Sequence, residues 1–248
     1  MGLKFSSGEN NDGRTQKMKV LFVGNSHTYF NDMPELFARF VECTTGEHPD
    51  VTMLAYSCRD LEWHRKEYFT LRFNLMYGKY DYCFIQQAAH PYPPVESTMR
   101  FGKEIIDLCH RCGVMPVVYM TWAEKRFPEH QQIMIDTCEA LAKEQNALLA
   151  PVGTIWRYVR EKDPDIELYY KDGEHASPYG DFLIAAVLCK LVTGEISGAV
   201  NGLGLDFMQG RPFELDMPLA LEDRTTVQVL LEQEKTASIL TVIQHVMN

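Results

Sequence analysis

Five short apolar runs alternate with longer segments in which apolar residues recur at helical spacing. The runs are rich in Val, Ile and aromatic residues and are apolar at consecutive positions, which is typical of strands buried on both faces of a parallel sheet. They span residues 20–23, 51–55, 82–85, 116–120 and 147–152. Helix-length segments lie between them at about 33–45, 60–77, 96–112 and 129–145. The alternation predicts an α/β fold, a three-layer α/β/α sandwich around a five-stranded parallel sheet.

The C-terminal third holds further predicted segments. A helix is expected over 178–193, because Ser177-Pro178 supplies an N-cap with a first-turn proline and Thr193-Gly194 supplies a stop. Residues 195–217 are rich in Gly and Pro and predict a loop excursion, whereas residues 222–247 predict one closing helix. Residues 1–17 are polar, so we predict a flexible leader followed by a single domain over 18–248.

Composition narrows the classes of function. The 248 residues carry a formal net charge of -10 with no basic run that offsets it, so long-range electrostatics disfavours nucleic acid and anionic membranes as partners. The apolar runs are far too short to span a membrane, and residues 1–17 contain no apolar core of signal-peptide length. We therefore expect a cytoplasmic protein whose seven cysteines are reduced and mostly buried.

A serine follows the first apolar run directly, in VLFVGNSHTYFND at residues 20–32. In a parallel sheet Ser26 then lies at the carboxyl edge, near the N-terminus of the next helix, where backbone N–H groups favour an anion. A serine hydroxyl becomes a good nucleophile only when a base takes its proton. The alternative is that Gly24-Asn25-Ser26 simply turns the chain.

The best candidate base lies in YYKDGEHASPYG, residues 169–180, in the loop before the predicted helix 178–193. Asp172 and His175 are three positions apart, so the carboxylate can fix the tautomer of the imidazole and leave its other nitrogen free to accept the Ser26 proton. The G-x-S-x-G elbow is absent, because Thr28 stands at its second glycine. Simple helix capping is the competing explanation for Asp172.

These blocks resemble the SGNH/GDSL hydrolases, and most closely a branch that opens with a GNS-T-like block. The resemblance covers about residues 18–194, and it is carried by VLFVGNSHTYFNDMPELF, GVMPVVYMTWA, LLAPVGTIWR and DGEHASPYG. It implies a flavodoxin-like SGNH hydrolase fold. It also implies that Ser26 is the nucleophile, His175 the base and Asp172 its orienting partner.

The family builds an oxyanion hole from the N–H of the serine, the N–H of a glycine after the second strand and an asparagine side chain after the third. This chain departs at both later positions. AYSCRDLEWH places Ser57 or Cys58 where the glycine is expected, and we assign the donor to Cys58. FIQQAAHPYP contains no asparagine. The resemblance favours Gln86 as the side-chain donor there, with Gln87 and His90 as rivals.

The resemblance therefore predicts a serine esterase that hydrolyses small acyl esters, acetyl groups on carbohydrates among them. Its partner would be a small-molecule or carbohydrate ester, and neither a metal nor an organic cofactor is needed. Six aromatic residues in or near the predicted active-edge loops could stack on a sugar: Tyr92, Trp122, Phe127, Trp156, Tyr169 and Tyr170. The alternative is a non-catalytic carbohydrate-binding protein on the same fold.

Overall fold

The five predicted strands form one sheet in the computed structural model, which describes residues 17–202, 205–208 and 226–248. The strands are β1 (Lys19–Gly24), β2 (Asp50–Ala55), β3 (Tyr82–Gln86), β4 (Met115–Tyr119) and β5 (Leu148–Ala150). Their order is β2-β1-β3-β4-β5 and every pairing is parallel. The predicted fold class is confirmed. The predicted leader, except Lys17, lies outside the described residues.

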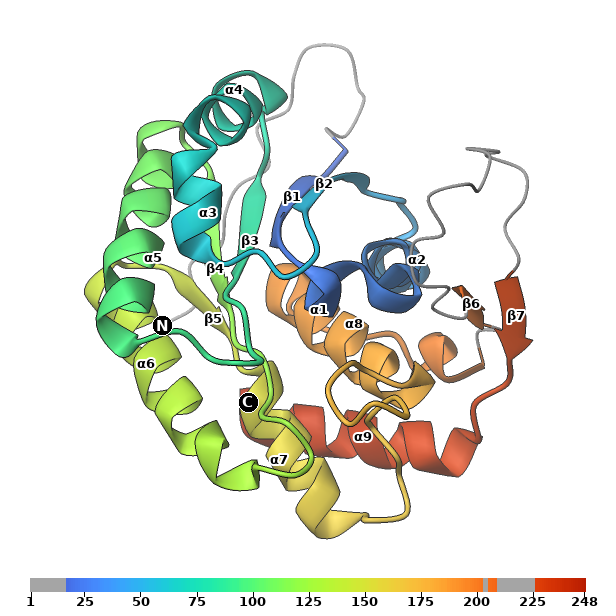
Figure 1. Ribbon diagram of the computed structural model, residues 1–248. Coiled ribbons are helices and arrows are strands. Elements are labelled where there is room, and N and C mark those ends of the chain that lie inside the picture. The colour runs from blue at the N-terminus through green and yellow to red at the C-terminus, as the bar shows by residue number, and fades with distance from the viewer. Residues whose placement is uncertain (1–16, 203–204, 209–225) are drawn as a thin grey trace, which may run out of the picture.

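Helices cover both faces of the sheet (Figure 1). One layer contains α2 (Met33–Thr45), α7 (Val152–Lys162), α8 (Pro178–Thr193) and α9 (Gln233–Met247). The other contains α3 (Leu61–Lys66), α4 (Tyr68–Gly78), α5 (Val95–Arg111) and α6 (Gln131–Glu144). Side chains of β1 alternate between the two cores, since Phe22 packs in one and Leu21 in the other. This burial on both faces explains why the run is apolar at consecutive positions.

Short elements complete the part of the chain that the structure describes. They are α1 (Ser26–Tyr29), η1 (Phe30–Asp32), η2 (Pro128–His130), η3 (Gly198–Gly202), β6 (Leu205–Met208) and β7 (Thr226–Val229). Within the described ranges, none of the helices combines the length and apolarity that a membrane crossing requires.

Three element predictions are wrong. The single helix expected over 60–77 is two helices, because the backbone leaves helical geometry at Glu67, with φ -74° and ψ 42°. The helix α7 was not predicted, and Val152 begins it instead of ending a strand. The closing helix expected over 222–247 starts only at Gln233.

The residues before α9 form β7, which pairs antiparallel with β6. The sequence Thr226-Val227-Gln228-Val229 alternates polar and β-branched apolar residues, which suits a strand better than a helix. The predicted loop over 195–217 therefore contains η3 and β6, and the remaining positions from 209 lie outside the described residues, as do 222–225.

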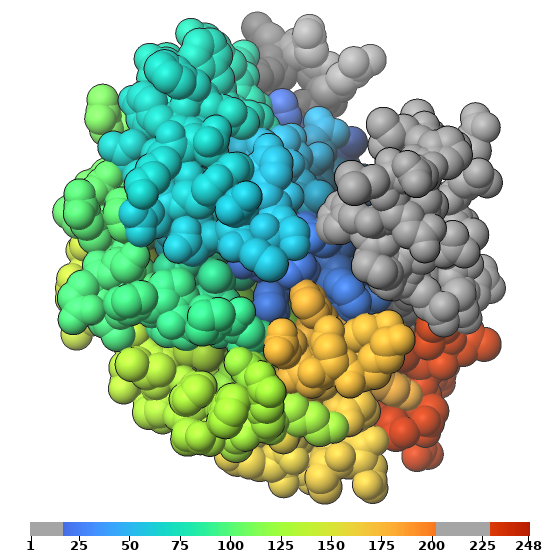
Figure 2. Space-filling view, in the orientation of Figure 1, coloured from blue at the N-terminus to red at the C-terminus, as the bar shows by residue number. Residues whose placement is uncertain are grey.

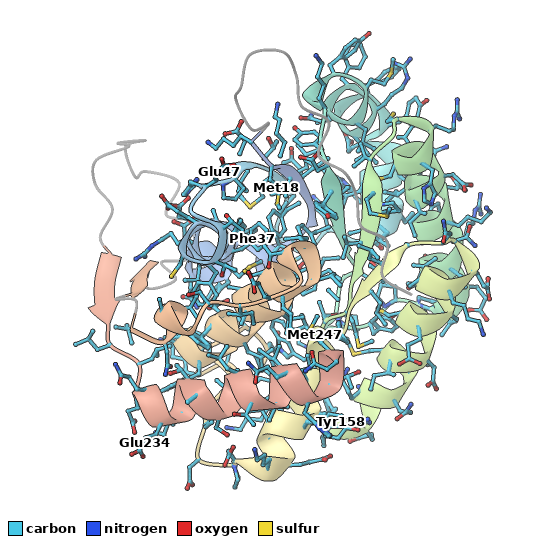
Figure 3. All side chains as sticks on the ribbon, turned by 180° about the vertical axis from the view of Figure 1, so that it is seen from behind. Met18, Phe37, Glu47, Tyr158, Glu234 and Met247 are labelled. Atoms are coloured by element: carbon cyan, nitrogen blue, oxygen red, sulfur yellow. The ribbon has the colours of Figure 1, made fainter. Side chains whose placement is uncertain are left out.

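Seen from behind, α9 lies across α7 and α8 on the outside of one layer (Figure 3). Ile239 and Ile243 of α9 are fully buried and belong to the same core as the central strands. The described part of the tail is thus packed against the sandwich by apolar contact.

Truncation of a buried α9 side chain tests this packing. Ile239→Ala should lower the free energy of unfolding by about 2–5 kcal/mol, because it removes buried methyl groups and leaves a cavity. Leu230→Ala is the matched control, since Leu230 is 83% exposed, and it should change stability by less than about 0.5 kcal/mol. If denaturant titrations show equally small losses of stability for Ile239→Ala and Leu230→Ala, then α9 does not contribute to the hydrophobic core.

Candidate active site

The turn after β1 is held by a buried side chain from the neighbouring strand. The Oε1 atom of Gln86, the last residue of β3, accepts a hydrogen bond from the Asn25 N–H at 2.9 Å and another from the Thr28 hydroxyl at 2.9 Å. A Cβ at position 24 would overlap with Gln86 Oε1 and Thr28 Oγ1, so this close approach requires Gly24. The turn therefore has a specific structure that presents the next residue, Ser26, at the sheet edge.

The same turn is tied to the loop after β2. Asn25 accepts from the His27 N–H at 3.0 Å and donates its side-chain amide to the Arg59 carbonyl at 2.9 Å. The Tyr56 N–H donates to the Gly24 carbonyl at 3.1 Å. These bonds hold the predicted oxyanion loop of residues 56–60 beside Ser26.

Ser26, His175 and Asp172 form one continuous hydrogen-bonded line. The Asp172 Oδ2 lies 2.8 Å from His175 Nδ1, and His175 Nε2 lies 2.9 Å from Ser26 Oγ. With Asp172 ionised, Nδ1 carries the imidazole proton, so Nε2 is left to accept from the serine hydroxyl. The structure thus brings together the three residues predicted from the sequence. Figure 2 shows the blue surface of the α1 region meeting the orange surface of the loop before α8 near the centre of one face.

The charge of Asp172 is supported by the loop itself. Burial alone would raise its pKa, but the Glu174 N–H and the His175 side chain and N–H all bond to the carboxylate, and together they lower the pKa. The two backbone bonds go to Oδ1, at 2.9 Å from Glu174 and 3.0 Å from His175. An ionised carboxylate therefore faces the imidazole throughout the neutral pH range.

A second buried contact connects the serine segment to the histidine loop, and no sequence pattern indicated it. Asn31 in η1 donates to the Ala176 carbonyl at 3.1 Å and to the Asp181 carboxyl in α8. Burial raises the pKa of Asp181 well above its usual range, although the Asn31 bond opposes this. The bond between Asn31 and Asp181 therefore fixes the start of α8 against the segment after Ser26.

The predicted oxyanion donors include two backbone N–H groups, those of Ser26 and Cys58. Neither the Ser26 N–H nor the Cys58 N–H is used by the bonds that hold the turn and the loop of residues 56–60. Cys58 has φ +59°, the left-handed conformation that a glycine would adopt readily. The departure from the family's glycine thus retains the N–H at the cost of a less favourable backbone.

The predicted side-chain donors are engaged elsewhere. Gln86 is fully buried and donates to the Gln87 carbonyl, so the geometry is at odds with the oxyanion role assigned to it. Gln87 donates to Thr98 at 3.0 Å. His90 Nε2 lies 3.1 Å from the Trp122 carbonyl, which can only accept, so a neutral His90 has no N–H to spare. The sequence suggested an amide in this segment without revealing that it serves the turn.

Half of the aromatic residues proposed to stack on a sugar are core residues. Trp122, Trp156 and Tyr169 are each at most 3% exposed. The two indoles stack at 4.2 Å and 4°, and Tyr169 meets Trp156 edge-on at 5.1 Å. Phe127 is 39% exposed, and Tyr92 and Tyr170 are partly exposed. A cavity of about 450 Å³ has Trp156, Tyr169 and Arg160 in its wall, whereas the triad does not contribute to that wall.

The described residues contain no group of three or more His, Cys, Asp or Glu side chains arranged to hold a metal ion.

Replacement of Gln86 tests its role in the turn. Gln86→Met keeps the approximate volume but leaves the Asn25 N–H and the Thr28 hydroxyl without their buried acceptor. We expect the free energy of unfolding to fall by about 2–6 kcal/mol, from roughly 1–3 kcal/mol for each of the two unsatisfied buried groups. Gln132→Met, on the exposed face of α6, is the control and should have little effect. A Gln86→Met protein as stable as wild type would contradict the turn-holding role.

No protein-family model matches the chain, and no curated protein matches it either. Several solved structures are similar to this chain. A candidate SGNH hydrolase from Slackia heliotrinireducens is 26% identical, with a TM-score of 0.62, and the match covers 71% of this chain and 100% of that one. The lipase/acylhydrolase of Enterococcus faecalis is 18% identical, with a TM-score of 0.56, covering 73% and 97% of the two chains.

A DUF4886 family protein from Bacteroides uniformis is similar over more of the chain. It is 14% identical, with a TM-score of 0.64, and the match covers 94% of this chain and 95% of that one. The likeness at this level shows the shared fold and extends past the part that the other two structures cover. The matches to SGNH and GDSL proteins confirm the resemblance at the level of the superfamily, while the GNS-T branch stays a prediction: the chain has the fold of the SGNH/GDSL hydrolases.

Proposed function

We propose that the protein is an esterase that hydrolyses small acyl esters with Ser26 as nucleophile, His175 as general base and Asp172 as the orienting carboxylate. The observation that carries the proposal is the unbroken line from Ser26 Oγ to His175 Nε2 and from His175 Nδ1 to Asp172. This arrangement supplies a base for the serine and fixes which nitrogen accepts the proton.

In the proposed reaction Ser26 Oγ bonds to the ester carbonyl carbon while its proton passes to His175 Nε2. His175 then returns that proton to the alcohol oxygen as the carbon–oxygen bond breaks, which leaves an acyl-Ser26 intermediate. Water attacks the intermediate with His175 again as base, and the acid leaves with Ser26 restored. Asp172 stays ionised throughout and stabilises the imidazolium that forms twice per cycle.

The oxyanion would rest on the N–H groups of Ser26 and Cys58. A third donor from a side chain is not part of the proposal, because Gln86 uses its amide to hold the turn. Loss of one donor typically costs about 100- to 1,000-fold in rate. We therefore expect a slower esterase than a relative with all three donors.

Short acyl chains suit the surroundings of Ser26 best. The Ser26 hydroxyl contacts the His175 imidazole, and the rings of His27 and Phe30 stack on that imidazole, so the surroundings of the base are aromatic. Acetyl esters, including those of carbohydrates, are the first substrates to examine. Phe127 and Tyr170 offer partly exposed rings near the His175 loop for an alcohol group.

One observation favours a second candidate, a carbohydrate-binding protein without turnover. Each of the three predicted side-chain donors already has another hydrogen-bond partner, which would matter less for binding than for catalysis.

Active-site labelling separates these two candidates. A fluorophosphonate should label wild-type protein covalently at Ser26, and Ser26→Ala should abolish labelling. Asp172→Asn should lower kcat for a short nitrophenyl ester by about 1,000- to 10,000-fold, since the imidazole would lose its tautomer and its counter-charge. Asp165→Asn is a surface control. Absent labelling of folded wild-type protein would favour the binding candidate, and ester turnover that survives Ser26→Ala would refute the mechanism.

A chain-length series tests the substrate class. The specificity constant kcat/KM should be highest for acetyl and propionyl nitrophenyl esters and should fall at least about tenfold by octanoyl. Release of acetate from peracetylated sugars should be detectable and should depend on Ser26. A kcat/KM that rises steadily with the length of the acyl chain would point to a lipase and contradict the short-acyl assignment.

A further inference from the structure

The imidazole of His175 has two ring partners besides its hydrogen-bond partners. Phe30 stacks on it with a centroid separation of 4.6 Å and an interplanar angle of 25°. His27 stacks on it at 4.9 Å and 21°. Both rings come from α1 or the residue after it, the segment that carries Ser26 itself. The proposed nucleophile and the two rings that orient its base are therefore parts of one rigid turn.

His27 is held in turn by a buried neighbour. Its Nε2 lies 3.1 Å from His90 Nδ1, with the two ring planes at 70°. A proton on His90 Nε2 for the Trp122 carbonyl makes His90 Nδ1 the acceptor and His27 Nε2 the donor, and it leaves His27 Nδ1 without a proton 3.3 Å from Asn25 Oδ1. This series of hydrogen bonds leads back to the triad, because Trp122 Nε1 donates to the Glu174 carbonyl at 2.8 Å and the Glu174 N–H donates to Asp172.

His27 and His90 are both neutral near pH 7. Burial lowers the pKa of His27 well below its usual value, helped by His90 and His175, while the Glu174 carbonyl opposes the shift. Burial also lowers the pKa of His90 to about 4, with His175 acting in the same direction. The Trp122 carbonyl, Glu124 and Asp172 act against it without reversing it.

We propose that Phe30 and His27 are positioning residues that hold the His175 imidazole in the plane facing both Ser26 and Asp172, with His90 fixing His27. The inference rests on the proposed esterase function and extends it. Because His27 carries no charge, the imidazolium that forms on His175 meets a neutral ring on that side. The π-face of Phe30 stabilises the imidazolium as a cation–π partner.

A purely structural role for these rings would predict a different result from a positioning role. Lost packing would lower stability and leave the turnover of the folded fraction unchanged. Lost positioning lowers kcat in protein that is fully folded, with KM nearly unchanged, because the substrate does not need the ring to bind.

The experiment compares Phe30→Leu with Phe30→Tyr, using kcat, KM and the pH profile for a short nitrophenyl ester. Phe30→Leu keeps apolar volume without a ring and should lower kcat about 5- to 20-fold, as expected for an aromatic contact that stabilises a cation. Phe30→Tyr restores a ring and should recover most of the loss. His27→Gln should lower kcat by a similar factor. Phe73→Leu, which removes an exposed ring from α4, should leave kcat unchanged.

A wild-type kcat in folded Phe30→Leu and His27→Gln would overturn the inference while leaving the esterase function intact. If wild-type protein does not turn over esters at all, the proposed function fails first. Nitrogen-15 NMR of the wild-type imidazoles then still tests the ring cluster. His27 and His90 should both be neutral at pH 7, and a charged His27 would overturn the inference.

Discussion

The hydrogen bond between Ser26 and His175 joins positions 149 residues apart, and the rest of the site is arranged so that this contact exists. The serine sits on a turn at the end of β1, and the histidine sits in a loop before α8. Two flexible loops would make such a bond only part of the time, because ordering each residue costs about 1–2 kcal/mol of conformational entropy. The chain removes this cost in advance by fixing each loop to a buried element.

That fixing is done with buried polar groups. Gln86 supplies an acceptor under the serine turn, and the pair of Asn31 and Asp181 connects the segment after Ser26 to the histidine loop. A buried polar group stabilises only when it is hydrogen-bonded, so these side chains specify a single geometry instead of a range. The raised pKa of Asp181 fits this logic, since burial disfavours the charged form of a carboxyl beside an uncharged amide.

Much of this arrangement could be predicted from the sequence, and the rest depended on contacts between elements. Five apolar runs gave the sheet, and the blocks around Ser26 and His175 identified the residues that the structure brings together; their catalytic roles stay a proposal. The sequence could not show that Gln86 faces the turn, because this follows from the register that pairs β1 with β3. It did contain a signal for α7, since Val152, Ile155, Trp156 and Val159 follow helical spacing, but a strand assignment that ran through Val152 obscured it.

Several residues near the candidate site have an unusual backbone conformation. Among the described non-glycine residues, positive φ values occur at Asn31, Asp32, Cys58, Lys79 and Asn146. Lys79 follows the end of α4 and Asn146 lies just past α6, places where a left-handed residue ordinarily ends a helix. The other three border the serine turn or form the loop that faces it. Asn and Asp tolerate this conformation, but Cys58 gains nothing from it in stability. Unfavourable backbone persists where the surroundings impose it and function uses it, so the conformation of Cys58 supports an oxyanion role for its N–H independently of the triad.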